Sequence, residues 1–360
     1  MSKSNYTHNE LLLLSGFYKI GPVGYQKLVA SETDLIRCSA SNLTQVGIKP
    51  QTAAEFIQFR DQFDVDYARE KLDECNVKTV AITDDEYPTM LKEITDPPYL
   101  LYVLGDTAVL NSVCLAVVGS RNHSHYGVAA VEKLIPDVVA HGITIVSGLA
   151  YGIDAKAHRM CVESEGKTVA VVGSGLDKLY PTDNQLLARD IIKTGGAIIS
   201  EYPLGTAPLR QHFPARNRII SGISQATLVI ECDIKSGAMI TAHHAIDQNR
   251  DVLALPGTIT SGFSAGPNRL IKMGAKLIES SQDIIENYNL SWSGNKNQLI
   301  AEPMKGHEQA VFELLSTDPV HIDQLIELST LKSDEVGSAL LFLEMKGLVR
   351  NIGAANYVRR

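Results

Sequence analysis

The chain has 360 residues, 44% of them hydrophobic and 21% charged, which is enough to build two or three domain cores. No stretch approaches the roughly 18 uninterrupted apolar residues that span a bilayer, and the polar start predicts no export signal. The net charge of −8 argues against a protein that coats duplex DNA with a broad basic face. The five cysteines are widely spaced and form no C-x-x-C pair, so neither a disulfide framework nor a zinc cluster is indicated. We expect a cytoplasmic protein without membrane insertion, whose cysteines are small core residues.

Residues 1–72 carry short apolar periodic runs separated by glycine turns, which predict a small helical domain. The turn Gly21-Pro22-Val23-Gly24 falls between two of these helices. A turn of this G-x-x-G kind can present backbone N–H groups to a phosphate, as helix-hairpin-helix modules do. A bundle used for packing or protein contacts explains the same pattern, and we favour that interpretation.

Residues 73–288 alternate apolar β-rich runs, each ended by glycine or serine, with helical stretches. The expected strands are 77–82, 115–118, 143–146, 168–172, 197–199, 226–230 and 252–255. Strands that are apolar on both faces and separated by helices are typical of a parallel sheet covered on both sides. This pattern predicts a doubly wound α/β domain whose ligand lies at the carboxyl ends of the strands.

Residues 289–304 are polar and lack periodicity, so we expect a linker. In residues 305–360, three amphipathic helices and a short hairpin predict a winged-helix domain. Its third helix begins Lys332-Ser333-Asp334-Glu335, and carboxylates at this place would repel the phosphates of duplex DNA. We therefore expect this domain to contact protein or to regulate, rather than to read duplex sequence.

Three of the expected strands end in loops of small residues, which suit a site made of backbone N–H groups. The loops begin Gly119-Ser120-Arg121, Ser147-Gly148 with Gly152 four residues later, and Gly173-Ser174-Gly175. Glycine lets the backbone approach a phosphate, the following helix N-terminus favours negative charge, and an arginine can bind phosphate oxygens in a fork. The three loops together favour an anion site over tight turns that merely need glycine.

The sequence does not match the known signatures of nucleotide-binding loops. Gly166-Lys167-Thr168 resembles the end of a Walker loop, but Cys161 replaces the glycine five positions earlier. In the run that begins Gly173-x-Gly175, Lys178 replaces the third glycine of the dinucleotide fingerprint. No metal-ligand spacing stands out, so we expect no cofactor and no metal.

The segment Pro208–Gly222 holds three arginines and a phenylalanine in a stretch without acids. Arg210, Arg216 and Arg218 supply charge for a phosphate backbone, and Phe213 supplies a ring on which a base can stack. The combination points to single-stranded nucleic acid. Alternatively, Phe213 belongs to the core and the last two arginines pair with Asp154, Glu201 or Glu231; we expect one of those two to be such a structural strut.

These segments resemble the DNA-processing protein A (DprA/Smf) family and follow the family's order across roughly residues 85–280. The matching runs are 117–121, 147–154 with 157–158, 173–177 with 180–181, 200–203, 213–222, 236–242 and 255–257. The flanking regions are similar to the family's SAM-like or helix-hairpin-helix domain and its winged-helix domain. The resemblance implies an extended Rossmann-like domain that binds single-stranded DNA.

The resemblance also implies a function and a set of site residues. The family forms homodimers and helps the recombinase RecA load onto DNA during natural transformation and recombination, in place of single-strand-binding protein, a further candidate partner. Arg121 and Arg210 match basic residues that grip the DNA backbone, and Phe213 matches the aromatic residue that meets the bases. A basic position of some relatives is Thr182 here, which predicts weaker binding or greater reliance on the two arginines. The candidate DNA-binding residues are Gly119, Ser120, Arg121, Ser147, Gly148, Gly152, Gly173, Gly175, Arg210, Phe213, Arg216, Asn217, Arg218, Ser236 and Gly237.

Two other functions compete with a non-enzymatic DNA-binding mediator. Similar glycine-rich Rossmann domains include nucleotide ribohydrolases, and Asp154, Glu201 or Glu231 could supply an acid or base. No paired-carboxylate constellation supports that enzyme. A nucleotide-sensing regulator, with the winged helix as output, is the third interpretation.

Overall fold

The computed structural model describes residues 6–288, 306–316, 318–345, 348–353 and 355–359, so the expected linker 289–304 lies outside the described residues. The chain divides into two compact units, Met1–Ser293 and Gly294–Arg360. The first unit contains both the amino-terminal helices and the large sheet. Among the described residues, no helix is long and apolar enough to cross a membrane.

The amino-terminal part of the first unit is a bundle of short helices with well-defined starts. The helices are α1 (His8–Gly16), α2 (Pro22–Ala30), α3 (Ala40–Gln45), α4 (Pro50–Arg60) and α5 (Val65–Glu74). Thr7 and Glu10 form a capping box at α1, and proline opens α2 and α4, where its missing N–H has no intrahelical partner to lose. The four leucines of α1 are all buried, which confirms the apolar run as a core helix.

The central element is a nine-stranded sheet in the order β1-β2-β6-β5-β4-β3-β7-β8-β9. The strands are β1 (Lys78–Ala81), β2 (Leu100–Gly105), β3 (Cys114–Val118), β4 (Thr144–Ser147), β5 (Thr168–Val171), β6 (Ala197–Ser200), β7 (Ala226–Val229), β8 (Asp251–Ala254) and β9 (Lys276–Leu277). The seven neighbouring strands β6-β5-β4-β3-β7-β8-β9 all pair in parallel. This confirms the expected doubly wound α/β fold.

The sheet differs from the expectation at both edges, because the short strand β9 was not expected and the opposite edge is antiparallel. Strand β2 was not among the expected strands, and it pairs antiparallel with both β1 and β6. Only the one-turn helix α6 (Thr89–Lys92) lies between β1 and β2, so no full helical crossover returns the chain in parallel. The sheet is therefore mixed, with a parallel centre and an antiparallel extension.

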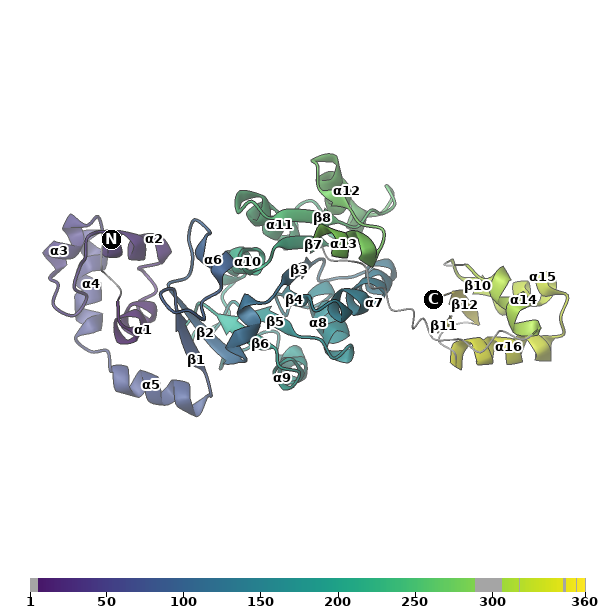
Figure 1. Cartoon of the computed structure of the whole chain (residues 1–360), viewed down its shortest axis with the longest axis horizontal. Helices are drawn as coiled ribbons and strands as arrows, with labels where there is room; N and C mark the ends of the chain where they lie inside the picture. The colour runs from purple at the N-terminus through teal and green to yellow at the C-terminus, as the bar shows by residue number, and fades with distance from the viewer. Residues whose placement is uncertain (1–5, 289–305, 317, 346–347, 354, 360) are drawn as a thin grey trace. The chain divides into compact units, whose positions relative to one another are not determined.

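Helices cover both faces of the sheet (Figure 1). Helices α6, α10 (His212–Ile223), α11 (Gly237–Asp247) and α12 (Ala265–Lys272) pack on one face, and α7 (His125–Ala140), α8 (Ile153–Glu163), α9 (Gln185–Lys193) and α13 (Ser281–Asn287) pack on the other. Alternate residues of β3 serve the two layers, since Leu115 and Val117 contact the second set while Ala116 and Val118 contact the first. Fully buried strands of this kind require the continuous apolar runs seen in the sequence.

The amino-terminal helices share a hydrophobic core with one face of the sheet. Tyr25 stacks on Tyr99 with ring centroids 4.8 Å apart, and the Ser15 hydroxyl lies 2.5 Å from the Tyr102 hydroxyl. The buried leucines of α1 belong to the same cluster as Tyr102. The helical region is thus packed onto the antiparallel extension, within one compact unit.

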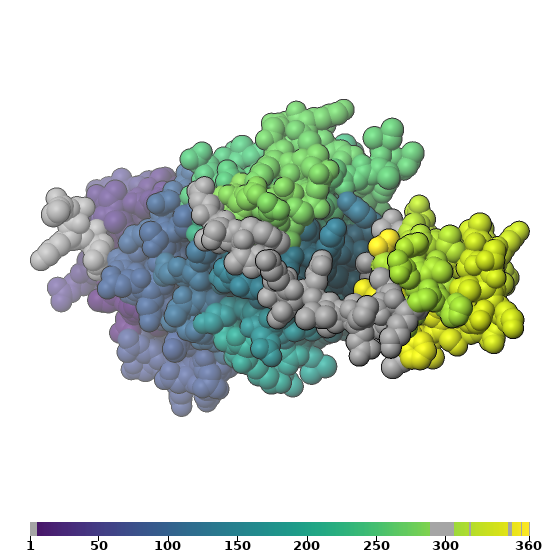
Figure 2. All heavy atoms as spheres, turned by 45° about the vertical axis from the view of Figure 1, so that its right-hand side comes forward, coloured from purple at the N-terminus to yellow at the C-terminus, as the bar shows by residue number. Residues whose placement is uncertain are grey.

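The second unit has the expected winged-helix elements. Helices α14 (His307–Leu314), α15 (Ile322–Ser329) and α16 (Ser333–Met345) surround a small core, beside a sheet of β10 (Val320–His321), β12 (Asn356–Arg359) and β11 (Val349–Gly353) in that order. Figure 2 shows this unit in yellow and yellow-green. Asp334 and Glu335 lie in the first turn of α16, which leaves that helix start acidic.

Candidate nucleic-acid interface

The main cavity lies where the strand order of the sheet reverses, between β3 and β7. Its volume is about 1070 Å³, and the loops after these two strands line it. In open α/β sheets, ligands bind outside the carboxyl ends of the strands at this kind of reversal. The lining includes nine of the candidate residues, namely Gly119, Ser120, Arg121, Arg210, Phe213, Arg216, Asn217, Ser236 and Gly237.

The loop after β3 depends on glycine to reach its position. A Cβ on Gly119 would lie 2.6 Å from the Ile153 side chain, and one on Gly152 would lie 2.2 Å from the Ser120 carbonyl oxygen. Gly152 also has φ of +81° at the start of α8. The Ser120 N–H donates to the Glu231 carbonyl at 2.8 Å, which ties the loop to the end of β7. The glycines therefore hold the backbone that presents Arg121.

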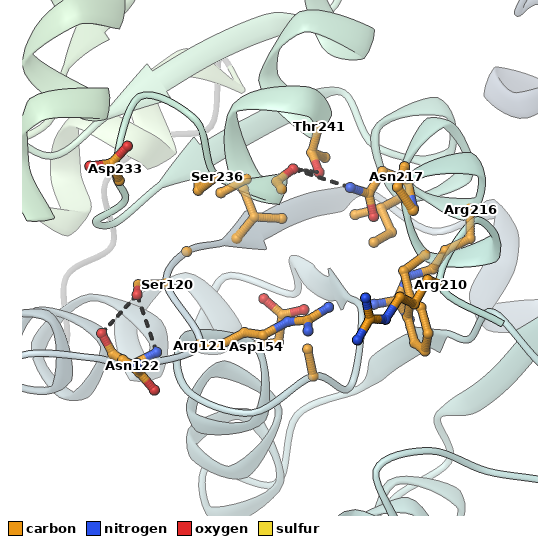
Figure 3. A pocket seen from close by; sticks show the side chains of 18 of the residues that line it. Ser120, Arg121, Asn122, Asp154, Arg210, Arg216, Asn217, Asp233, Ser236 and Thr241 are labelled. Atoms are coloured by element: carbon orange, nitrogen blue, oxygen red, sulfur yellow. Dashed lines mark hydrogen bonds between the residues drawn. The ribbon is translucent and has the colours of Figure 1, made fainter. Parts of the chain in front are cut away.

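Arg121 and Arg210 approach the same cavity from different segments of the chain (Figure 3). Both side chains belong to exposed residues. Neither forms an ion pair with any described carboxylate, although Arg121 lies near the Phe213 ring, 5.7 Å from its centroid. Two guanidinium groups without carboxylate partners provide ten N–H donors for phosphate oxygens.

Phe213 is only partly buried, so it is not a simple core residue. Its ring meets Tyr180 edge-on, with centroids 5.7 Å apart, and lies 5.6 Å from the Arg216 guanidinium carbon. Arg121 lies at a similar distance from the ring. The ring therefore stands in the cavity among positive charges, an arrangement suited to a base attached to a phosphate.

Arg216 is buried beneath the cavity, with 4% of its surface exposed. Its Nη1 donates to the carbonyl oxygens of Gly148 and Val171, which joins the ends of β4 and β5. Burial lowers the pKa of Arg216 to about 10, and the Asp154 carboxylate opposes this shift. Burial raises the pKa of Asp154, which accepts the Gly148 N–H at 3.2 Å. A Cβ on Gly148 would overlap the Arg216 guanidinium, so this glycine makes room for the buried charge.

Arg218 lies outside the cavity. Its guanidinium binds the Glu201 carboxylate through two nitrogen–oxygen contacts of 2.7 Å, and its Nε lies 3.0 Å from Asp96. The residue is 6% exposed. Its position does not support its inclusion among the DNA-binding candidates, and it fits the expected structural strut, because a buried arginine needs such carboxylate partners.

The remaining candidates shape the loops without lining the cavity. They are Ser147, Gly148, Gly152, Gly173 and Gly175. Ser147 Oγ donates to the Val117 carbonyl at 2.6 Å, and a Cβ on Gly175 would lie 2.7 Å from the Pro203 carbonyl oxygen. These residues determine where the loops lie, and the N–H groups of Gly148 and Gly175 already donate to Asp154 and to the Thr206 carbonyl.

Several lining residues were not predicted as site residues. They are Asn122, Tyr180, Asp233, Thr241 and Phe263 among others. Asn122 adjoins the matching run 117–121, and Tyr180 belongs to the matching run 180–181. Thr241 lies one helical turn after Gly237, so spacing on α11 could have indicated it. Nothing in the sequence signals that Asp233 and Phe263 reach the cavity.

The three carboxylates that an enzyme would need are already engaged. Glu201 binds Arg218, Asp154 lies beside Arg216, and Glu231 accepts hydrogen bonds from the Ser124 N–H and hydroxyl at 2.7 and 2.5 Å. Glu231 therefore stabilises the start of α7 instead of pairing with an arginine. Among the described residues, no cluster of His, Cys, Asp and Glu could hold a metal ion.

The cysteines follow the expectation with one exception. Cys38, Cys114, Cys161 and Cys232 are buried and unpaired, as small core residues would be. Cys75 is exposed, since it follows the last residue of α5, where the helix reaches the surface. The prediction that every cysteine is a core residue was therefore wrong for Cys75.

His158, fully buried under the site, should make folding sensitive to mild acid. Its Nδ1 lies 2.7 Å from the Thr168 hydroxyl, and burial, with the nearby Arg216 charge, lowers its pKa from 6.5 to about 3. The unfolded chain therefore binds the proton more readily, and stability is lost as pH falls from 6.5 towards 3. We expect this residue alone to cost about 2 kcal/mol at pH 5. Urea unfolding of wild type and His158→Gln at pH 7 and 5 tests this, because the variant should lose less stability between the two pH values. Equal losses would contradict it.

Comparison with known proteins agrees with this geometry. Residues 78–289 match the family described as DNA recombination-mediator protein A, and residues 299–353 match the DprA winged helix domain. Protein Smf of Escherichia coli is 35% identical over 97% of this chain and 94% of its own length. The DNA processing protein DprA of Streptococcus pneumoniae is 43% identical over 63% of this chain and 79% of its own.

Solved structures give the same result. The X-ray structure of DNA processing protein A from Streptococcus pneumoniae aligns with a TM-score of 0.67 at 35% identity, covering 78% of this chain and 98% of that one. DNA processing protein A from Helicobacter pylori, whose structure is described for its single-stranded DNA binding mode, aligns with a TM-score of 0.54 at 29% identity. The alignment covers 59% of this chain and 95% of that one. The chain belongs to the DNA recombination-mediator protein A (DprA/Smf) family.

Proposed function

We propose that this protein binds single-stranded DNA without strong sequence preference, in the cavity between β3 and β7. One observation carries the proposal: two guanidinium groups without carboxylate partners, Arg121 and Arg210, flank a partly exposed phenylalanine ring. Phosphates would bind the arginines, and a base would stack on Phe213. Since every base has a flat face, such stacking tolerates any sequence. The single-stranded DNA binding of the Helicobacter pylori relative supports this choice of ligand.

The protein would act as a binding protein without catalytic residues. Asp154, Glu201 and Glu231 are held by structural partners, so none is available as a free acid or base on the cavity wall. No cofactor is needed for this activity. Release of a free base from nucleoside monophosphates would instead favour the ribohydrolase alternative.

In the cell, the protein would help RecA load onto single-stranded DNA during natural transformation and recombination. The family description as a recombination mediator supports this role. A homodimer would place two DNA sites side by side and raise affinity for a longer strand without new contacts. Binding would occur in the cytoplasm, in competition with single-strand-binding protein. The domain boundaries 1–72, 73–288 and 305–360 would separate helical, DNA-binding and winged-helix parts, and the acidic start of α16 supports protein contacts for the last.

A loading experiment tests the mediator role. RecA assembly on DNA precoated with single-strand-binding protein would be followed in three samples. The first lacks this protein, the second contains the wild type, and the third contains Arg121→Ala. We expect faster assembly with the wild type and little acceleration with the variant. Equal assembly rates in all three samples would contradict the RecA role, while direct DNA binding would be measured separately on bare oligonucleotides.

Removal of the Phe213 ring should weaken binding of every sequence by a similar factor. Phe213→Ala should lose about 1–3 kcal/mol of binding free energy, because a stacked base loses its platform. Phe213→Trp should keep most of the affinity. Fluorescence anisotropy with oligothymidylate and oligoadenylate measures both. Full retention of affinity by Phe213→Ala would contradict the stacking role.

A further inference from the structure

A second cavity of about 410 Å³ lies further along the same edge of the sheet. Residues that follow β6 line it, together with residues at the start of β2. Because β2 runs antiparallel to β6, its start lies at the carboxyl end of β6. Both cavities therefore lie at the carboxyl ends of the parallel strands. The amino-terminal helices form the outer wall of the second cavity.

One short segment separates the two cavities. Pro208, Arg210 and Phe213 line the first cavity, while Leu209, Gln211 and His212 line the second. Residues next to one another in this segment therefore line different cavities. A strand that occupies both cavities would therefore pass over this segment at Arg210.

The second cavity offers aromatic surface. Tyr202 and His212 stack with ring centroids 4.1 Å apart and an interplanar angle of 21°, and both are partly exposed. Tyr18, in the turn after α1, also lines the cavity and is 82% exposed. An aromatic ring this exposed adds little to packing, so its contribution to the folded state is small.

Among the described residues, the lining of the second cavity carries no unpaired negative charge that would repel a nucleic-acid strand. Glu201 is the one carboxylate residue on its lining, and Arg218 neutralises it. Gly21 and Pro22 of the G-x-x-G turn also line it, at the N-terminus of α2, which no side chain caps. A helix N-terminus attracts negative charge. Aromatic faces, a neutralised acid and an open helix start together fit a single strand, whose bases are free to stack, better than a duplex.

We infer that single-stranded DNA continues from the first cavity past Arg210 into the second, where its bases stack on Tyr18 and on the Tyr202–His212 pair. This inference rests on the proposed function, because the strand must first occupy the cavity between β3 and β7. It gives the amino-terminal helices a direct part in holding longer strands. Short oligonucleotides fill the first cavity alone.

The test compares full-length Tyr18→Ala with Tyr67→Ala on two oligothymidylates. Lengths of about 4 and about 16 nucleotides bracket the sites of single-strand-binding folds. Tyr67 is the control, because it is also an exposed tyrosine of the helical region, at 58%, with a lysine near its ring. It lines neither of these two cavities but a neighbouring one of about 820 Å³, which is not on the proposed path of the strand. Arg210→Ala reports on the first cavity. Affinities come from fluorescence anisotropy.

Tyr18→Ala should bind the long strand about tenfold more weakly, keep wild-type affinity for the short one, and regain affinity as Tyr18→Trp. Tyr67→Ala should match the wild type on both. Unchanged long-strand affinity in Tyr18→Ala, or an equal loss on both lengths, would overturn the inference while Arg210→Ala still shows the first site. If the wild type binds neither the short nor the long strand, the proposed function and this inference are overturned together.

Discussion

Replacement of Arg121 or Arg210 by alanine should weaken binding of single-stranded DNA about tenfold to a hundredfold, since each loses charge-assisted hydrogen bonds to phosphate. Each variant should also lower the slope of log affinity against log salt by about 0.7, the contribution of one phosphate contact on a single strand. Both side chains are exposed and form no ion pair with described carboxylates, so the fold should tolerate their loss. Anisotropy titrations at several salt concentrations measure affinity and slope together.

A matched control separates the site from net charge. Arg69 is also exposed, lies on α5, and lines neither cavity described above. Arg69→Ala removes the same charge and should leave affinity and salt slope near the wild-type values. If Arg69→Ala weakens binding as much as Arg121→Ala does, then overall charge, and not the cavity, holds the DNA.

Gly152→Ala should be the most destabilising single change near the site. Gly152 has φ of +81° and ψ of −129°, a backbone conformation that is unfavourable for alanine. The new Cβ would also lie 2.2 and 2.5 Å from the carbonyl oxygens of Ser120 and Arg121, and these are backbone atoms that cannot rotate away. We expect a loss of about 4 kcal/mol of unfolding free energy. Urea unfolding measures it, and DNA affinity should fall too, because the Arg121 loop must shift.

Gly142→Ala is the control for backbone strain alone. Gly142 has φ of +78°, but a Cβ at this position meets nothing within 4 Å. Its substitution should cost about 1–2 kcal/mol, the price of a left-handed conformation without a clash. Equal losses for the two variants would contradict the packing of Gly152 against the Arg121 loop.

The sequence predicts the centre of the fold well, because fully buried parallel strands leave continuous apolar runs. Strands β4 and β5 are each within a residue or two of the expected ranges. Strand β2 was missed, although Leu100–Val103 is apolar, since it follows the proline pair Pro97-Pro98 and has no crossover helix beside it. Strand β9 has two exposed residues, too few for any pattern to show.

The candidate site was also predicted only in part from the sequence. Arg121, Arg210 and Phe213 come together as the sequence suggested, because their segments follow strand ends or lie beside them. We expected one of Arg216 and Arg218 to be a strut, but both are buried and held by structural partners. The sequence could not show this, since the partners lie on or after different strands and depend on the strand order. It also gave no sign of the second cavity, which forms only where the amino-terminal helices pack against the antiparallel extension.

The most direct measurement is photocrosslinking of the full-length protein to a single-stranded oligonucleotide that carries a photoreactive uracil, followed by peptide mapping. We expect crosslinks to the peptide that contains Phe213, and we expect them to disappear in Phe213→Ala and to remain in Tyr67→Ala. Crosslinks confined to residues 306–359, or spread evenly over the surface, would contradict a DNA site between β3 and β7.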